Sequence, residues 1–342
     1  MSFEYVREVP HPDEIVREIP LSLGLKKIKH SRDKEILDIF RGKSQKFLVI
    51  IGPCSADNER SVCVYAQRLA KLQEKVDEKL VLVPRIYTNK PRTTGEGYKG
   101  MLHQPDPREA PSIVEGIKAI RKLHIRILQD TGLTSADEML YPDNYPYLVD
   151  LLSYVAIGAR SVENQQHRLT VSGIDIPVGM KNPTSGDLTV MLNSIQAAQQ
   201  PHVFTYNGWE VKTSGNPYAH AIVRGAINQY GQSIPNYHYE DLNSLAEKYL
   251  QRGLINPVII VDTNHANSNK HFEEQPRIAM EVIHSMRSSG VLKRLVKGLM
   301  IESYLEQGSQ AVSGRVFGRS ITDPCLGWED SKKLLLKLAD YL

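Results

Sequence analysis

The chain has 342 residues, of which 41% are hydrophobic and 24% are charged, and its formal net charge is +3. Because the charge is nearly balanced and no polybasic face is visible, nucleic-acid binding is disfavoured. No apolar run is long enough for a membrane helix, and the N-terminal region is too charged for a signal peptide. The three cysteines lack CxxC spacing, which argues against a disulfide framework or a zinc knuckle. We therefore expect a cytoplasmic protein without nucleic-acid or membrane partners.

Residues 1–45 are interrupted by prolines and predict short helical pieces, the clearest at 33–41. We interpret this segment as an arm outside the main fold that serves packing or assembly. From residue 46 onward, short β-rich apolar runs alternate with stretches of helical spacing. The predicted strands are 47–51, 80–86, 125–128, 154–157, 176–180, 219–223, 258–261 and 297–301. The predicted helices of this region are 61–76, 110–123, 188–198, 242–251, 277–286 and 330–342.

This alternation is typical of parallel βαβ units. Their number favours a (β/α)8 TIM barrel over an open, doubly wound sheet. No GxGxxG follows the first strand, which weakens the dinucleotide-binding alternative. The stretch 202–212 alternates like a β-hairpin and predicts an insertion near 202–217. The expected fold is an α/β protein: a catalytic barrel over 46–342, with an N-terminal extension and a small β-hairpin insertion.

A TIM barrel carries its chemistry at the C-terminal ends of its strands. Cations follow several predicted strands, and these are Arg85, Lys90, Arg92, Arg160, Lys181 and Arg224. Arginine forks bind phosphate or carboxylate, and lysine supplies a mobile point charge. Each cation alone could be a solvated surface residue, but several at one barrel mouth require anions to neutralise them. The pattern predicts a pocket for more than one anionic group.

A second set of strand-end and loop residues comprises Cys54, His265, Glu302 and Asp323. One thiol, one imidazole and two carboxylates could form a mixed site for a divalent metal ion, permissive across Mn, Fe, Co and Zn. The alternative is that Cys54 is a small core residue and His265 a satisfied turn residue. Their spacing along the chain carries no metal signature, so both interpretations stay open at this point.

Several longer motifs resemble one family in the same order along the chain. They are Ile51-Gly-Pro-Cys-Ser55, Lys90-Pro-Arg-Thr-Thr94, Gly158-Ala-Arg-Ser161, Val178-Gly-Met-Lys-Asn182, His265-Ala-Asn267 and Ser320-Ile-Thr-Asp323. From about residue 30 to the C-terminus the chain resembles the type I 3-deoxy-D-arabino-heptulosonate 7-phosphate (DAHP) synthases of the shikimate pathway. The related 3-deoxy-octulosonate 8-phosphate synthases typically carry Lys-Ala-Asn where this chain has Lys-Pro-Arg-Thr.

The resemblance implies a (β/α)8 barrel that condenses phosphoenolpyruvate with erythrose 4-phosphate and releases inorganic phosphate. It implies a metal ion, Mn²⁺ first and Fe²⁺, Co²⁺ or Zn²⁺ as alternatives, on Cys54, His265, Glu302 and Asp323. For phosphoenolpyruvate it implies Arg85, Lys90, Arg160, Lys181 and Arg224, with the backbone of Ala159. For erythrose 4-phosphate it implies Arg92 and Thr93, with Lys90 and Asp323 near its other end. Lys90 would act as the proton donor, and Cys54, His265 and Asp323 would act through the metal.

Two further expectations follow from the family. Its members are commonly inhibited by an aromatic amino acid, but Ile174-Asp175-Ile176 stands where enterobacterial relatives carry Leu-Ser, which puts such sensitivity in doubt. We expect a homodimer or homotetramer with the N-terminal arm at an interface. The alternative from another functional class is a non-catalytic sugar-phosphate sensor, which would be expected to lack the metal ligands.

Overall fold

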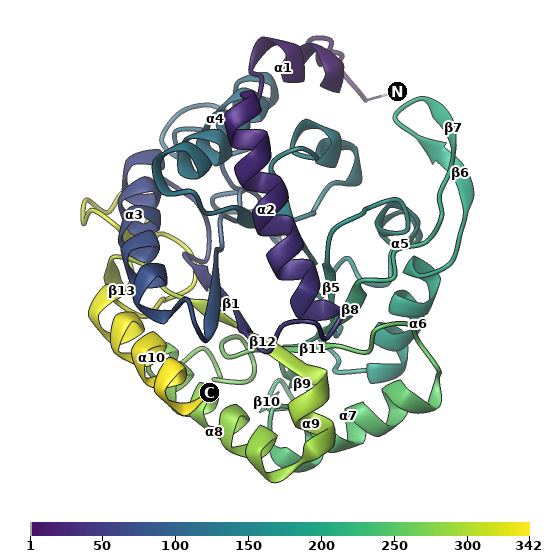
Figure 1. The fold of residues 1–342 in the computed structure, drawn as a ribbon. Helices are drawn as coiled ribbons and strands as arrows, with labels where there is room; N and C mark the ends of the chain where they lie inside the picture. The colour runs from purple at the N-terminus through teal and green to yellow at the C-terminus, as the bar shows by residue number, and fades with distance from the viewer. Residues whose placement is uncertain (1) are drawn as a thin grey trace.

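The computed structural model describes residues 2–342 and shows an eight-stranded parallel sheet surrounded by helices (Figure 1). Its strands are β1 (Phe47–Gly52), β2 (Leu80–Pro84), β3 (Ser135–Glu138), β4 (Leu152–Ile157), β5 (Val178–Lys181), β8 (Ala219–Val223), β11 (Ile259–Asp262) and β12 (Val296–Glu302). β12 pairs with β1, and a bridge between Arg85 and Ala136 joins the ends of β2 and β3. The predicted TIM barrel is confirmed.

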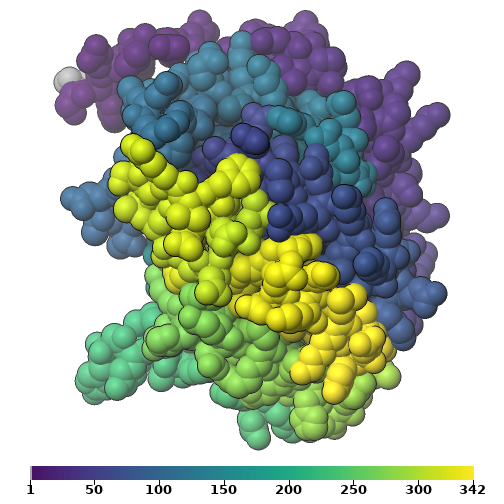
Figure 2. Space-filling model, turned by 90° about the vertical axis from the view of Figure 1, so that its left-hand side faces the viewer, coloured from purple at the N-terminus to yellow at the C-terminus, as the bar shows by residue number. Residues whose placement is uncertain are grey.

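The ring of helices follows the amphipathic pattern of the sequence. The α-helices after β1 are α3 (Glu59–Val76), α4 (Ile113–Thr131), α5 (Gln165–Val171), α6 (Leu188–Ala198), α7 (Tyr239–Gln251), α8 (Gln275–Ser288), α9 (Gly290–Leu295) and α10 (Trp328–Tyr341). Asn58 caps α3 by accepting a hydrogen bond from the Ser61 amide at 3.0 Å. Helix α10 packs beside α3, where the Trp328 and Tyr65 rings lie 5.7 Å apart (Figure 2). The last helix thereby completes the ring.

The N-terminal region contains α1 (Pro12–Glu18) and α2 (Leu23–Phe40), and α2 is longer than the predicted 33–41. Helix α2 lies across one end of the barrel (Figure 1). Its buried Ile36, Ile39 and Phe40 join the cluster of side chains that fills the barrel interior. Phe40 packs edge-on against His220, near the start of β8, with ring centroids 4.7 Å apart. Helix α2 therefore closes the barrel end away from the strand C-termini. The role of residues 1–45 in assembly remains a prediction.

The third predicted strand is wrong. Residues 125–128 belong to α4, and the third strand is β3, ten residues farther along. The apolar residues Ile120, Leu123 and Ile127 face the core at helical spacing, whereas β3 reads Ser-Ala-Asp-Glu and has no apolar run. Polar residues stand in β3 because Ser135 is hydrogen-bonded to His124 of α4, Asp137 accepts from Thr88, and Glu138 lines a cavity. Periodicity alone cannot identify such a strand.

The predicted hairpin insertion is confirmed by β6 (Val203–Tyr206) and β7 (Trp209–Lys212), which pair antiparallel. Other short elements are β9 (Ala226–Ile227), β10 (Ser233–Ile234), β13 (Glu306–Ser309), β14 (Arg319–Ser320), η1 (Pro142–Tyr147) and η2 (Phe272–Glu274). Within residues 2–342, no helix is both long enough and apolar enough to cross a membrane.

Candidate active site

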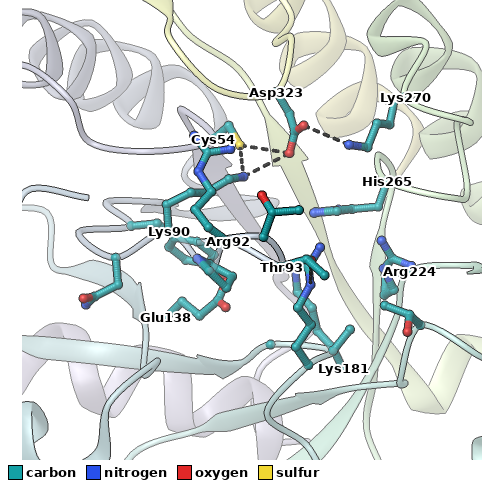
Figure 3. A pocket seen from close by; sticks show the side chains of 18 of the residues that line it. Cys54, Lys90, Arg92, Thr93, Glu138, Lys181, Arg224, His265, Lys270 and Asp323 are labelled. Atoms are coloured by element: carbon teal, nitrogen blue, oxygen red, sulfur yellow. Dashed lines mark hydrogen bonds and ion pairs between the residues drawn. The ribbon is translucent and has the colours of Figure 1, made fainter. Parts of the chain in front are cut away.

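A polar cavity of about 250 Å³ lies at the end of the barrel where the parallel strands terminate. Figure 3 shows side chains converging on it from strand ends and loops. The predicted site residues that line it are Cys54, Arg85, Lys90, Arg92, Thr93, Ala159, Arg160, Lys181, Arg224, His265 and Asp323. The remaining predicted residue, Glu302, is buried at the end of β12 and contacts this group through Arg85. The structure thus brings the predicted residues into one region.

Potential metal ligands gather on one wall of the cavity. The Cys54 sulfur and one carboxylate oxygen each from Glu302 and Asp323 lie within 4.8 Å of one another. His265 is adjacent, with its Nε2 3.9 Å from Glu302 Oε1. A sulfur, an imidazole nitrogen and carboxylate oxygens form a donor set that suits first-row divalent ions. The residues present therefore fit a bound transition metal.

The loop after β11 fixes the orientation of His265. Its backbone is left-handed, with φ 55°, and its Nδ1 lies 2.9 Å from Asp262 Oδ2. When Nδ1 donates its hydrogen to a carboxylate, Nε2 remains free as a ligand. Asp262 also accepts a hydrogen bond from Lys181 Nζ at 3.0 Å. Burial would raise the pKa of Asp262, but His265 and Lys181 outweigh burial and hold that pKa well below its ordinary value.

Lys90 stands at the junction between the potential metal ligands and the rest of the cavity. Its Nζ lies 2.7 Å from Cys54 Sγ and 2.9 Å from Asp323 Oδ2. Burial would lower the pKa of Lys90, but Cys54 and Asp323 outweigh burial and raise it. Lys90 is therefore an ammonium group that can donate a proton into the cavity. Burial, followed by the nearby Glu302, raises the pKa of the Cys54 thiol to about 11, so the thiolate needs a cation beside it.

Arg85 makes more contacts within the protein than its position in the sequence indicates. Its side chain is 2% exposed and donates to Glu302 Oε1 at 2.9 Å. It also donates to the Pro53 carbonyl and lies over the Tyr87 ring, 3.7 Å from the centroid. These contacts orient Glu302 toward His265. Arg85 lines the cavity with both terminal nitrogens bound to the protein, and its buried Nε has no hydrogen-bond partner within residues 2–342.

Other cations in the cavity have hydrogen-bond donors that are free to bind a ligand. Arg224 Nη1 is buried and has no hydrogen-bond partner within residues 2–342. Burial removes water from the Arg224 guanidinium and so lowers its pKa. An anion bound at this position would stabilise the charge. Arg160 Nε donates to Thr93 Oγ1 at 3.0 Å, and Arg92 Nε donates to the Tyr98 carbonyl at 2.9 Å. Within residues 2–342 the terminal nitrogens of Arg160 and Arg92 make no hydrogen bond, so they are available at the mouth of the cavity.

Sequence reasoning missed several residues in or beside the site, among them Glu138, Asp262 and Lys270. Glu138 ends β3 and lines the cavity; a Cβ on Gly158 would lie 2.3 Å from its Oε1, so glycine at 158 makes room for this carboxylate. Correct placement of β3 would have revealed Glu138. Asp262 directly ends its strand, which is the signal that could have found it. Lys270 lies 3.0 Å from Asp323 through its Nζ and had no sequence signal.

The fold and the cavity define a (β/α)8-barrel enzyme that handles anionic substrates. A profile of the DAHP synthetase I family matches residues 21–336. Phospho-2-dehydro-3-deoxyheptonate aldolase of Haemophilus influenzae is 36% identical, over 98% of this chain and 92% of that protein. The Phe-sensitive enzyme of that name from Escherichia coli is 37% identical, over 98% and 95%.

A solved structure supports the same assignment. Phospho-2-dehydro-3-deoxyheptonate aldolase from Francisella tularensis superposes with a TM-score of 0.91, at 29% identity, over 100% of this chain and 98% of that chain. The chain belongs to the DAHP synthetase I family. The family resemblance predicted from the sequence is confirmed.

Proposed function

We propose that the protein is a DAHP synthase, which joins phosphoenolpyruvate and erythrose 4-phosphate to give 3-deoxy-D-arabino-heptulosonate 7-phosphate and phosphate. The observation that carries the proposal is Arg224 Nη1, which is buried without a hydrogen-bond partner within residues 2–342, in a cavity lined by Cys54 and Asp323 with Glu302 beside them. A candidate anion-binding group and candidate metal ligands therefore lie close together in a chain that belongs to this family. We propose a cytoplasmic location for the reaction.

The two substrates divide the cavity between them. Phosphoenolpyruvate carries a carboxylate and a phosphate, and we assign it to Arg160, Lys181 and Arg224, with the Ala159 backbone and, at its inner edge, Arg85 and Lys90. The phosphate of erythrose 4-phosphate is assigned to Arg92 and Thr93. The hydrogen bond from Arg160 to Thr93 supports an arrangement in which these two regions are adjacent. Holding two mutually repelling anions together in reactive geometry lowers the entropic part of the barrier.

The reaction follows from the groups in place. Carbon C3 of phosphoenolpyruvate attacks the aldehyde carbon of erythrose 4-phosphate, and Lys90 gives its proton to the alkoxide oxygen that forms. Water then adds at C2 to give a phosphohemiketal. The bond between C2 and the oxygen of the phosphate group then breaks, and inorganic phosphate leaves. Cys54, His265, Glu302 and Asp323 would hold the divalent ion, for which we propose Mn²⁺ with Fe²⁺, Co²⁺ or Zn²⁺ as substitutes. Such an ion supplies Lewis-acid polarisation of the aldehyde.

Product analysis tests the proposal directly. Purified protein with Mn²⁺ and both substrates should form DAHP and release one phosphate per condensation, and a chelator should abolish turnover until a divalent ion is restored. His265→Ala should lose both the metal and the activity, whereas His271→Ala, an exposed change in the same loop, should retain both. Full activity in metal-free protein, or no DAHP from metal-loaded protein, would refute the proposed function.

A second cavity supports a regulatory function. It has a volume of about 770 Å³, lies between η1, α5 and the β6–β7 hairpin, and includes Tyr145, Ile174 and Phe204 in its lining. Thr170 Oγ1, also in this lining, is buried without a hydrogen-bond partner within residues 2–342. Asp175 is exposed and does not belong to the lining. We therefore propose that an aromatic amino acid binds here, as the names of the Tyr- and Phe-sensitive E. coli relatives suggest.

Inhibition assays with Phe, Tyr and Trp in turn identify the ligand. One of them should inhibit the parent, and Thr170→Val should raise its half-inhibitory concentration about tenfold while leaving turnover without inhibitor unchanged. Insensitivity of the parent to all three amino acids would exclude this regulatory function without affecting the catalytic proposal.

Assembly is the remaining part of the proposed function. The N-terminal segment exposes Phe3, Tyr5 and Val6, at 79%, 92% and 78%, and the hairpin exposes Trp209 at 69%. Large apolar side chains with this exposure are typical of interfaces between subunits. We propose a homodimer or homotetramer in which these residues are covered.

A further inference from the structure

Lys270 lies in an unusual backbone segment beside the potential metal ligands. His265, Asn269 and Lys270 all have left-handed backbones, with φ of 55°, 51° and 59°. A left-handed conformation costs a non-glycine residue about 1 kcal/mol, and asparagine tolerates it better than lysine does. The Lys270 amide donates to the His265 carbonyl at 2.8 Å, which ties it to the backbone of a proposed ligand. Because the backbone at this position favours asparagine over lysine, we expect the lysine side chain to have a function that offsets this cost.

The side chain of Lys270 reaches another proposed ligand. Its Nζ lies 3.0 Å from Asp323 Oδ1, an ion pair drawn as a dashed line in Figure 3. The other oxygen of the same carboxylate, Oδ2, lies 2.9 Å from Lys90 Nζ and 3.5 Å from Cys54 Sγ. Asp323 therefore has an outer oxygen bound by Lys270 and an inner oxygen directed at the Cys54 thiol. The loop after β11 and the loop between β14 and α10 are joined through this contact.

We propose that Lys270 is a positioning residue that holds Asp323 with Oδ2 turned toward the metal site. The inference rests on the proposed function, in which Asp323 is a metal ligand. The two lysines differ in role because they bind different oxygens. A metal ion would compete with Lys90 for Oδ2 and for the Cys54 sulfur, so Lys90 must move when the ion binds. Lys270 binds the oxygen that the ion does not need, so it can remain in place when the ion binds.

The positive charge of Lys270 opposes metal binding through space, and this effect must be weighed against its orienting effect. The Lys270 side chain is 61% exposed, so water and salt screen its repulsion of an ion at the cluster. Hydrogen-bonded partners of metal ligands typically change metal affinity about 10- to 100-fold when they are removed. Orientation therefore outweighs repulsion, and loss of the ammonium group should weaken metal binding.

The test measures Mn²⁺ binding in the absence of substrates, from the electron paramagnetic resonance signal of free Mn²⁺. Lys270→Asn suits the left-handed backbone but lacks the ammonium group, and Lys270→Arg keeps a cation. We expect the dissociation constant to rise about 10- to 100-fold in Lys270→Asn and less than threefold in Lys270→Arg. Lys333→Asn, which removes an exposed lysine paired with Asp330 on α10, serves as the matched control and should bind as the parent does.

Thermal unfolding of the metal-free proteins separates this role from a structural one. Lys270→Asn should unfold at the same temperature as the parent or above it, because the better backbone preference of asparagine offsets the loss of an exposed ion pair that contributes little to stability. Lys270→Asn protein that binds Mn²⁺ as tightly as the parent, or more tightly, would overturn the inference while leaving the DAHP synthase proposal intact. A parent that binds none of Mn²⁺, Fe²⁺, Co²⁺ and Zn²⁺ would overturn both. A parent that binds Mn²⁺ but forms no DAHP would refute only the catalytic proposal.

Discussion

His265 Nδ1 is hydrogen-bonded to Asp262 Oδ1 at 3.1 Å and lies 2.9 Å from Oδ2, and this contact connects the potential metal ligands to the anion-binding side of the cavity. The connection exists because the same Asp262 carboxylate accepts from Lys181 Nζ at 3.0 Å. Asp262 is 1% exposed and Lys181 is 3% exposed, so this ion pair is almost fully desolvated. One buried carboxylate thus orients a proposed metal ligand and a proposed phosphoenolpyruvate ligand together.

The first prediction is that Asp262→Asn impairs both functions of the site. Removing the charge leaves Lys181 buried without a counterion, which should cost about 3–5 kcal/mol of stability. Mn²⁺ affinity should fall about tenfold or more because His265 loses its orienting acceptor. Denaturant unfolding and Mn²⁺ titration measure the two effects. Asp106→Asn, which breaks an exposed pair with Arg108, is the control and should change neither by a comparable amount.

The second prediction separates the two substrate phosphates. Arg160→Ala should raise the KM for phosphoenolpyruvate, and Arg92→Ala should raise the KM for erythrose 4-phosphate. Each loses charge-assisted hydrogen bonds, so the expected effect is about 1.5–3 kcal/mol, or roughly 10- to 150-fold. Steady-state kinetics with each substrate varied at saturating concentrations of the other provide the measurement. An Arg92→Ala effect confined to phosphoenolpyruvate would show that the two regions are assigned the wrong way round.

The barrel was predictable because most of its strands are apolar on both faces. Runs such as Phe47–Gly52 and Leu80–Pro84 are buried throughout, so hydrophobic patterning identifies them directly. β3 failed this criterion because Asp137 accepts hydrogen bonds from Thr88 and Glu138 lines the cavity. A strand whose side chains serve a site loses the pattern by which strands are recognised.

The candidate site was predictable where strand-end cations and motifs mark it, but the partners of those residues were not. Nothing in the sequence indicates that Arg85 is engaged by Glu302, 217 residues away. The contact between Lys270 and Asp323 likewise joins two separate loops. Such pairings depend on how the loops fold over the barrel, which single-sequence patterns do not specify.

The third prediction concerns assembly and requires a short deletion. Removing residues 1–9 eliminates the exposed Phe3, Tyr5 and Val6 but spares α1, whose Ile15 is 1% exposed and packs in the core. The truncated chain should keep its unfolding temperature and lose mass in solution by light scattering or sedimentation, because the apolar contacts of the interface are gone. Trp209→Ser should act in the same direction from the hairpin. Unchanged mass in both variants would exclude these segments as interfaces.

The fourth prediction concerns the pH dependence of stability and arises from His220 beneath α2. His220 Nδ1 lies 2.8 Å from the Tyr218 carbonyl and Nε2 lies 2.7 Å from the Tyr154 hydroxyl, so the neutral ring is satisfied on both sides. Burial lowers the pKa of His220 from 6.5 to about 4. Between these values the unfolded chain binds a proton that the folded chain does not, so stability must fall as the pH drops below 6.5.

The expected loss at pH 5, relative to pH 7.5, is about 2 kcal/mol from His220. Asp57 acts in the opposite direction because burial raises its pKa to about 6, so the His220 contribution is obtained by comparing the parent with His220→Gln. The variant should lose less stability than the parent between these pH values, as measured by denaturant unfolding. His284→Gln, an exposed change, should behave as the parent does. Equal pH dependence in the parent and His220→Gln would mean that His220 is not the buried neutral group that limits stability in acid.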